Sequence, residues 1–455
     1  MRRSPLENPE QPSLFRIPEV DTPSDLRETK PADYGTFKDS LRAPVHSWFR
    51  YPAGFSYRFV DAMIDRFGIV RGDWVYDPFS GTGTTLIGSK QQGINGYGVE
   101  AHSFVHWVAS VKLFWEFDLT ALADELGRVL AQAREHVHLR RGGALPGGAF
   151  PELVYKCYHP DTLYQLFLLR QYVQEEISDT HLRNLAQLAL TDTLRTAAAA
   201  GTGWPYIAPN KNTGEKPARD ALGLFAKTLT KMAADLTKLP ATSAECEIRN
   251  VLGDSRQRQA LDDGQIGLAL TSPPYLNNYD YADRTRLETY FWGITKTWKD
   301  ITEQFRDKLM VAATTQVVRK RHDVETALSE EVRDVDEHVY AAVQKAVIEL
   351  SSLRLKKGGK KDYDLMVALY FNDMLLVLQE TYRVLRAGGR FCVVLGDSAP
   401  YGVYIPTHDL VGKLGLGLGF RRFDYEEFRT RGDKWKANPQ RHRVQLREGV
   451  VILQK

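Results

Sequence analysis

The chain has 455 residues, more than one ordinary domain, so we expect a core with large insertions or a second domain. Its 60 basic and 57 acidic residues leave a net charge of +3, which neither requires nor excludes nucleic acid; a binding groove would have to be a local basic patch. Three widely spaced cysteines without a Cys-x-x-Cys pair indicate neither a disulfide framework nor a zinc site, so a reducing cytoplasm is the simplest location.

Residues 1–42 are polar and rich in proline, which predicts a poorly ordered N-terminal arm. No apolar stretch follows Met1-Arg2-Arg3, so we expect no secretory signal. No run reaches the ~20 apolar residues that span a bilayer, so we expect no membrane segment.

Residues 43–117 contain the pattern of a nucleotide-binding unit. A β-prone run, Trp74–Tyr76, precedes the glycine-rich segment Asp77–Thr84, and a helical pattern follows to Gln92. Gly81 and Gly83 would let the backbone approach a ligand closely. A phosphate loop is the competing interpretation, but no Gly-Lys-Ser/Thr follows the glycines.

A second predicted strand, Gly96–Val99, ends at Glu100. A carboxylate at the carboxyl end of such a strand can accept hydrogen bonds from both hydroxyls of a ribose. Together, the glycine-rich segment and Glu100 predict an adenosine site.

From Asp118 the pattern changes to helical spacing, with apolar residues at Leu119, Leu122, Leu126, Leu130 and Val137. A second helix is expected from Pro160 to Ile177, so residues 118–247 read as a helical insertion. A second insertion, 300–360, carries one long helical pattern over Glu331–Leu350 and two basic runs. Both insertions are candidates for target recognition.

Residues 248–299 are predicted to carry the chemistry. The apolar run Ile266–Thr271 ends in Ser272-Pro273-Pro274-Tyr275. Two prolines remove two backbone donors and fix two φ angles, so the carbonyls of Ser272 and Pro273 can point rigidly at a ligand. An exocyclic amino group on a base needs such acceptors and an aromatic plate, which Tyr275 would provide. This turn therefore suggests methyl transfer to N4 of cytosine or N6 of adenine.

In these motifs the sequence resembles the S-adenosylmethionine-dependent DNA amino-methyltransferases of the N4-cytosine/N6-adenine class. Asp77–Thr84, Glu100 and Thr271–Tyr275 resemble the family's cofactor loop, ribose carboxylate and catalytic turn, and Val251–Ser255 resembles the element that contacts the adenine amino group. His46–Ser56 resembles the segment beside the methionine end. Residues 361–455 form the C-terminal part of the core, in which Val384–Arg390 and Phe391–Ser398 resemble the late helix, turn and strand that close the sheet.

The resemblance implies an α/β fold, a Rossmann-like class I methyltransferase sheet with helices on both faces, plus large mainly helical insertions. It implies S-adenosylmethionine as cofactor and a catalytic turn made of Ser272, Pro273, Pro274 and Tyr275. The cofactor-binding candidates are Phe55, Asp77, Pro78, Phe79, Gly81, Gly83, Thr84, Glu100, Asp254 and Ser255. Helix capping would be another role for Asp254.

Nucleic-acid contacts are expected from the residues just past the turn and from the basic runs of the second insertion. The first group could equally continue the fold, and the second could be solvated loops. The candidates are Asn278, Tyr279, Tyr281, Arg284, Arg319, Lys320, Arg321, Lys356, Lys357, Lys360 and Lys361.

The predicted reaction is direct in-line transfer from S-adenosylmethionine to a flipped base in double-stranded DNA, without a covalent enzyme intermediate. Carbon-5 methylation looks absent because no cysteine follows a proline. Ser272 favours N4 of cytosine by resemblance; the alternatives are a DNA N6-adenine enzyme, an RNA amino-methyltransferase and a catalytically silent nucleic-acid-binding scaffold. A cognate restriction endonuclease or defence-system partner is a hypothesis about context, and no metal is expected.

Overall fold

Seven strands form one mixed sheet in the order β3-β2-β1-β4-β5-β7-β6. Strands β1 to β5 pair in parallel, whereas β7 runs antiparallel to both β5 and β6. The strands are β1 (Trp74–Asp77), β2 (Asn95–Glu100), β3 (Ile248–Leu252), β4 (Ile266–Thr271), β5 (Leu385–Gly396), β6 (Arg422–Arg431) and β7 (Leu446–Gln454). This computed structural model describes residues 31–51, 54–139, 145–199, 207–208, 217–240, 245–356, 360–431 and 444–455.

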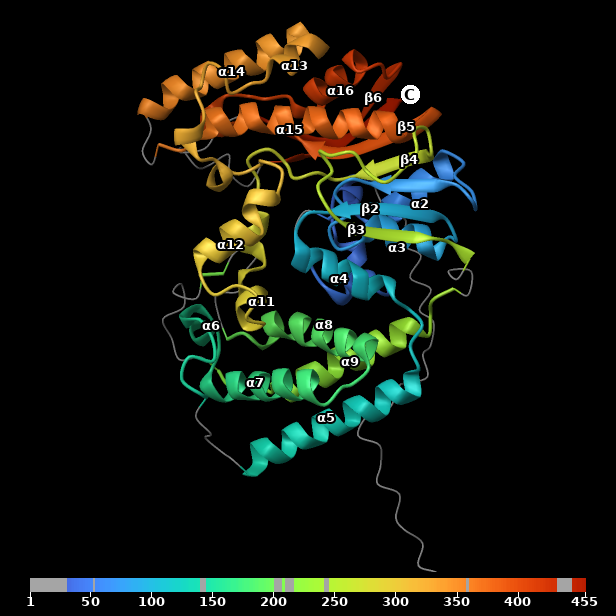
Figure 1. Ribbon diagram of the computed structural model, residues 1–455, viewed down its shortest axis with the longest axis vertical. Coiled ribbons are helices and arrows are strands. Elements are labelled where there is room, and N and C mark those ends of the chain that lie inside the picture. The colour runs from blue at the N-terminus through green and yellow to red at the C-terminus, as the bar shows by residue number, and fades with distance from the viewer. Residues whose placement is uncertain are drawn as a thin grey trace, which may run out of the picture. The chain divides into compact units, whose positions relative to one another are not determined.

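Helices cover both faces of this sheet (Figure 1), which confirms the predicted Rossmann-like α/β fold. Those of the unit that contains the sheet are α1 (Pro31–Tyr34), α2 (Tyr57–Arg66), α3 (Thr84–Gln91), α4 (Ser103–Leu113), α10 (Tyr281–Arg284), α11 (Arg286–Phe291), α12 (Trp298–Gln304), α13 (Glu330–Val335), α14 (Glu337–Lys356), α15 (Tyr363–Val384) and α16 (Thr407–Gly417). Short 3₁₀ helices are η1 (Asp39–Leu41), η2 (His46–Trp48), η5 (Arg306–Lys308), η6 (Thr314–Gln316), η7 (Arg319–Arg321) and η8 (Pro400–Gly402).

Side chains that alternate along a strand pack into two separate hydrophobic cores, one on each face of the sheet. On β5, Phe391 and Val393 belong to the core shared with α14, α15 and α16, whereas Cys392 and Val394 belong to the core shared with α2. This follows from the two-residue period of a strand, since both faces of the sheet are buried.

The remaining described helices form a second unit within residues 114–199 and 217–238. They are α5 (Leu119–Leu139), α6 (Glu152–Cys157), α7 (Pro160–Glu175), α8 (Thr180–Ala197) and α9 (Ala221–Leu236). The apolar stripe predicted on α5 is buried at Leu122, Leu126 and Leu130. Asp179 and Asp220 cap α8 and α9 by accepting backbone N–H groups of their first turns.

The helical unit has different limits from the predicted insertion, 118–247. It begins at Phe114 and ends at Lys238. Residues 245–247 belong to the sheet unit, because Glu245 pairs with Arg71 and the amide of Glu247 bonds to Asn95 of β2.

Part of the predicted N-terminal arm is ordered. Residues 31–42 contain α1 and η1, and the Tyr34 ring packs against Phe59 and Phe428 at centroid distances of 5.4 and 5.8 Å. These aromatic contacts pack the partly buried Tyr34 against the core, while residues 1–30 lie outside the described residues.

The second insertion, 300–360, is also integrated into the sheet unit. The single long helix predicted over Glu331–Leu350 is two helices, α13 and α14, separated by Asp336 in an extended conformation. The Asp336 carboxylate accepts the amide of Val339 and thereby caps α14. Val339, Val343 and Val347 are buried in the core shared with α15.

Candidate active site

The glycine-rich turn joins the carboxyl end of β1 to the first turn of α3. Gly81 has φ +53° and Gly83 has φ +84°, both in the left-handed region that glycine adopts without strain. Gly83 is the N-cap of α3, and its amide donates to the carbonyl of Ser80. The turn thus presents its backbone at the edge of the sheet where parallel strands end, which is where ligands bind in open α/β sheets.

The side chain of Asp77 holds this turn in place through hydrogen bonds. Its buried carboxylate accepts hydrogen bonds from the hydroxyls of Thr85 and Thr271, both at 2.6 Å, and from the amide of Phe79 at 3.0 Å. Burial raises its pKa to about 6. Asp77 was predicted to bind cofactor, but it is not among the described residues that line the pocket; its carboxylate instead ties together β1, α3 and β4.

Glu100 lies at the last position of β2, as predicted, and lines the pocket. One carboxylate oxygen accepts the amide of Gly81 at 2.9 Å, and the other accepts the amide of His102 at 2.7 Å. Burial raises the pKa of this carboxyl to about 7. Each oxygen keeps a second lone pair, so the group can still accept hydrogen bonds from a ligand.

The segment after β3 forms another wall. Gly253, Asp254 and Ser255 line the pocket. Arg256 pairs with Asp254 at 2.8 Å and with Asp373 of α15 at 3.1 Å, and it also donates to the carbonyl of Lys308 at 3.1 Å. This guanidinium therefore fixes the wall to the segment that lies across the pocket.

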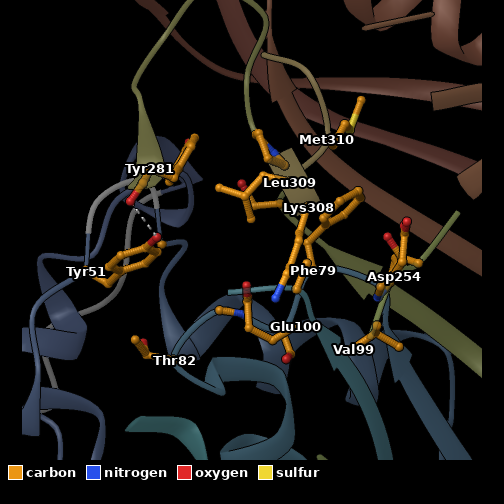
Figure 2. Close-up of a pocket in the computed structure, with 18 of the residues that line it drawn as sticks. Tyr51, Phe79, Thr82, Val99, Glu100, Asp254, Tyr281, Lys308, Leu309 and Met310 are labelled. Atoms are coloured by element: carbon orange, nitrogen blue, oxygen red, sulfur yellow. Dashed lines mark hydrogen bonds between the residues drawn. The ribbon is translucent and has the colours of Figure 1, made fainter. Parts of the chain in front are cut away.

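These walls enclose about 930 Å³ of empty space, part of it open to solvent. Figure 2 shows Lys308, Leu309 and Met310 on the opposite side of the pocket from Glu100, with Asp254 on one flank and Tyr51 on the other. Of the predicted cofactor-binding residues, the pocket is lined by Phe55, Pro78, Phe79, Gly81, Thr84, Glu100, Asp254 and Ser255.

Several pocket residues were missed by the sequence analysis. Lys308, Leu309, Met310 and Gln316 come from the second insertion, and no sequence signal ties them to the glycine-rich turn. The others were not named as site residues, although all except Ala101 lie inside the predicted motifs: Tyr51, Gly54, Ser80, Thr82, Val99, Ala101 and Gly253.

The predicted catalytic turn is divided between the pocket and the core. Ser272 and Pro274 line the pocket, and the buried Ser272 hydroxyl has no hydrogen-bond partner among the described residues. Pro273 is buried, and Tyr275 is 5% exposed within the hydrophobic core. The guanidinium of Arg431 lies over the Tyr275 ring, 5.2 Å from its centroid. In this conformation Tyr275 is thus a core residue and not an open stacking plate.

The predicted nucleic-acid residues separate into three groups. Tyr281 lines the pocket, and Asn278 and Tyr279 are half-buried beside the catalytic turn. Arg284 is 1% exposed and pairs with buried Glu288 at 3.3 Å, which places it in the core, whereas the half-buried Arg319 pairs with Asp364 at 2.8 Å. The exposed cations are Lys320, Arg321, Lys356, Lys360 and Lys361, whereas Lys357 lies outside the described residues.

A buried lysine on α4 holds the glycine-rich turn from behind. The Lys112 ammonium donates to the carbonyl of Thr82 at 2.9 Å and to the carbonyl of His46 at 3.4 Å. Its side chain is fully buried, and burial lowers its pKa to about 7. The contact links two segments that the sequence placed at the same cofactor site.

The pocket suits a nucleoside-type cofactor with a polar tail. Gly81 brings backbone close to the ligand space, and the carboxylates of Glu100 and Asp254 lie at the ends of two neighbouring strands. Fold and pocket together define a Rossmann-like methyltransferase.

Comparison with known proteins specifies the class. A family model described as DNA methylase, of the N6/N4 methyltransferase type, matches residues 16–109. The type II methyltransferase M.BsoBI of Geobacillus stearothermophilus is 25% identical, over 92% of this chain and 87% of that protein. The type II methyltransferase M.AvaI of Nostoc sp. is 22% identical over 87% and 83%, respectively. These similarities support the assignment of the chain to the DNA amino-methyltransferases of the N4/N6 class.

A shorter similarity covers one block only: the type II methyltransferase M.MjaII of Methanocaldococcus jannaschii is 34% identical over 20% of this chain. Among the described residues, no cluster of three or more His, Cys, Asp or Glu side chains is arranged to hold a metal ion. Within the same residues, no helix combines the length and the apolar character that a membrane crossing requires.

Proposed function

We propose that this protein is a type II DNA methyltransferase that transfers a methyl group from S-adenosylmethionine to the exocyclic N4 of cytosine in double-stranded DNA. The observation that carries the proposal is the position of Ser272, which lines the same pocket as the glycine-rich turn and Glu100. A hydrogen-bond acceptor and a cofactor cradle in one pocket are what methylation of an amino group needs.

The proposed cofactor contacts come from three strand ends. Glu100 would accept hydrogen bonds from the ribose hydroxyls, Asp254 from the adenine amino group, and the turn around Gly81 would lie against the methionine part. When bound, S-adenosylmethionine supplies a methyl group on positively charged sulfur, which makes it open to attack by a neutral amine.

The proposed role of the catalytic turn is to hold the target amine. The Ser272 hydroxyl and the Pro273 carbonyl accept its two hydrogens, which directs the nitrogen lone pair out of conjugation with the ring. Ser272 need not be a strong base, because the amine becomes acidic only as it is methylated. The base must leave the duplex to enter the pocket, at a cost of a few kcal/mol.

Stacking of the base on Tyr275 would require a rearrangement. The Arg431 guanidinium occupies one face of the ring and also donates to the Asp397 carbonyl at 2.9 Å. We therefore expect either Arg431 to leave this face when a base enters, or Tyr281, which already lines the pocket, to contact the base instead.

The test is to incubate the protein with labelled S-adenosylmethionine and long, unmethylated duplex DNA, and to identify the modified nucleoside by mass spectrometry after digestion. Single-stranded DNA and total RNA run in parallel, and the Ser272→Ala variant measures background. We expect N4-methylcytosine in the duplex sample only. N6-methyladenine would move the target to adenine, label in RNA alone would refute a DNA substrate, and cofactor binding without any label would favour a scaffold.

A further inference from the structure

Two basic runs that lie 35 residues apart in the sequence meet at one carboxylate. Asp362 accepts hydrogen bonds from Arg319 of η7 at 3.0 Å and from Arg354 of α14 at 2.9 Å, both on the same oxygen. Arg319 also donates a hydrogen bond to each carboxylate oxygen of the fully buried Asp364, at 2.9 and 2.8 Å. These contacts are charge-assisted and partly buried, so they fix the two runs against each other.

We call the contacts of Arg319 and Arg354 with Asp362 and Asp364 the junction. Exposed cations lie next to these residues on each segment that contributes to it. Lys320 and Arg321 follow Arg319 directly, Lys356 lies two residues after Arg354, and Lys360 and Lys361 immediately precede Asp362. We call these five residues the basic surface. The carboxylates of the junction are already occupied by Arg319 and Arg354, so they do not neutralise the five exposed cations.

The run that carries Lys320 and Arg321 follows directly from a segment that lines the candidate active site. Gln316, three residues before Arg319, lines the pocket, and its side-chain oxygen accepts the amides of Ala312 and Ala313, which holds this segment in place. On the other run, the Lys361 amide donates to the Tyr401 hydroxyl at 3.0 Å; η8, which contains Tyr401, follows the carboxyl end of β5.

We propose that the basic surface binds the backbone phosphates of duplex DNA next to the base that enters the pocket. The inference rests on the proposed function for the choice of DNA. The whole chain carries a net charge of only +3, so attraction to a polyanion must come from a local patch. Five cations held beside the pocket on two braced segments form such a patch, and they would position the duplex without reading its sequence.

Phosphate contacts have a measurable signature. Each phosphate neutralised by a lysine or arginine releases counterions. A plot of the logarithm of the association constant against the logarithm of salt concentration therefore has a slope of about −0.9 per contact in duplex DNA. Removing two contacting cations should therefore weaken binding at low salt and make the slope shallower by up to about 2.

The experiment measures binding of a fluorescent 30-base-pair duplex of arbitrary sequence, without cofactor, from 50 to 300 mM salt. Two variants each remove two charges, Lys320→Gln/Arg321→Gln and Lys356→Gln/Lys361→Gln, and a third combines them. The charge-matched control is Lys345→Gln/Lys413→Gln, which changes exposed or half-exposed positions on α14 and α16 outside the basic surface.

We expect each double variant to weaken duplex binding about tenfold at 50 mM salt with a shallower slope, and the combined variant to lose more. The control should match the wild type. Equal loss in the control would mean that the effect comes from net charge alone and would overturn the proposal, as would loss from only one of the two runs.

The binding experiment and the methylation test of the proposed function can fail independently of each other. Unchanged duplex binding by a wild type that forms N4-methylcytosine would refute the basic surface alone. A wild type that forms no methylated base, with salt-sensitive binding lost in the variants, would refute the activity and keep the surface.

Discussion

The ammonium of Lys112 donates a hydrogen bond to the carbonyl of Thr82, 2.9 Å away, from a position that solvent does not reach. Thr82 lies in the glycine-rich turn and lines the pocket, whereas Lys112 lies on α4. The contact adds to the support that the turn receives from Asp77 and Glu100. Lys112 is therefore a positioning residue for the cofactor site.

We predict that Lys112→Met weakens S-adenosylmethionine binding about tenfold, equivalent to ~1.4 kcal/mol. The reason is that the carbonyls of Thr82 and His46 lose their shared donor. The matched control is Lys90→Met, which also removes a buried lysine, one that donates to the carbonyl of Leu113 at 2.7 Å. Calorimetry on both variants checks this; equal weakening in both would mean that Lys112 acts only on overall stability.

The raised pKa of Glu100 predicts a pH-dependent cofactor affinity. Burial brings this pKa to about 7, so the group is mostly protonated at pH 5.5 and becomes a carboxylate as the pH rises. Only the carboxylate can accept hydrogen bonds from two hydroxyls with both oxygens. Affinity should therefore increase between pH 5.5 and 7, by up to about tenfold per pH unit.

Titration of the Glu100→Gln variant over the same range provides the control. This variant should bind more weakly than the wild type at pH 7 and show a flat profile below it. Lys112, whose pKa is also about 7, loses its charge only toward the upper end of this range. A Glu100→Gln profile as steep as that of the wild type would assign the titration to another group.

Ser272→Ala should separate chemistry from cofactor binding. We expect methyl transfer to fall by roughly 10²-fold or more, as for loss of other groups that act on a reacting proton, with cofactor affinity within about twofold of the wild type. Ser255→Ala, in the segment after β3 that also lines the pocket, should instead weaken cofactor binding. Single-turnover rates and calorimetry check both variants, and full activity in Ser272→Ala would remove Ser272 from the mechanism.

Arg284→Met should destabilise the protein by about 3–5 kcal/mol, because it leaves the Glu288 carboxylate buried without this partner. The double variant Arg284→Met/Glu288→Leu should recover part of the loss. Urea unfolding measures both. Normal stability in Arg284→Met combined with weaker duplex binding would instead restore the prediction of a DNA contact at this position.

The sequence by itself determined the local parts of this site. A strand, a glycine turn and a helix follow one another through Asp77–Thr84, and Glu100 ends the next strand, because hydrophobic spacing and the conformational freedom of glycine act over a few residues. The parallel sheet then brings these strand ends to one edge.

Only the tertiary structure decided which charged residues serve the fold and which remain exposed. Arg284 and Arg319 were predicted as DNA contacts; in the structure each pairs with a buried carboxylate, and Arg284 is itself buried. In the same way, Lys308 lines the pocket and Lys112 holds the turn through contacts between residues far apart in the chain. Local patterns do not encode such contacts, since they depend on how the folded elements pack.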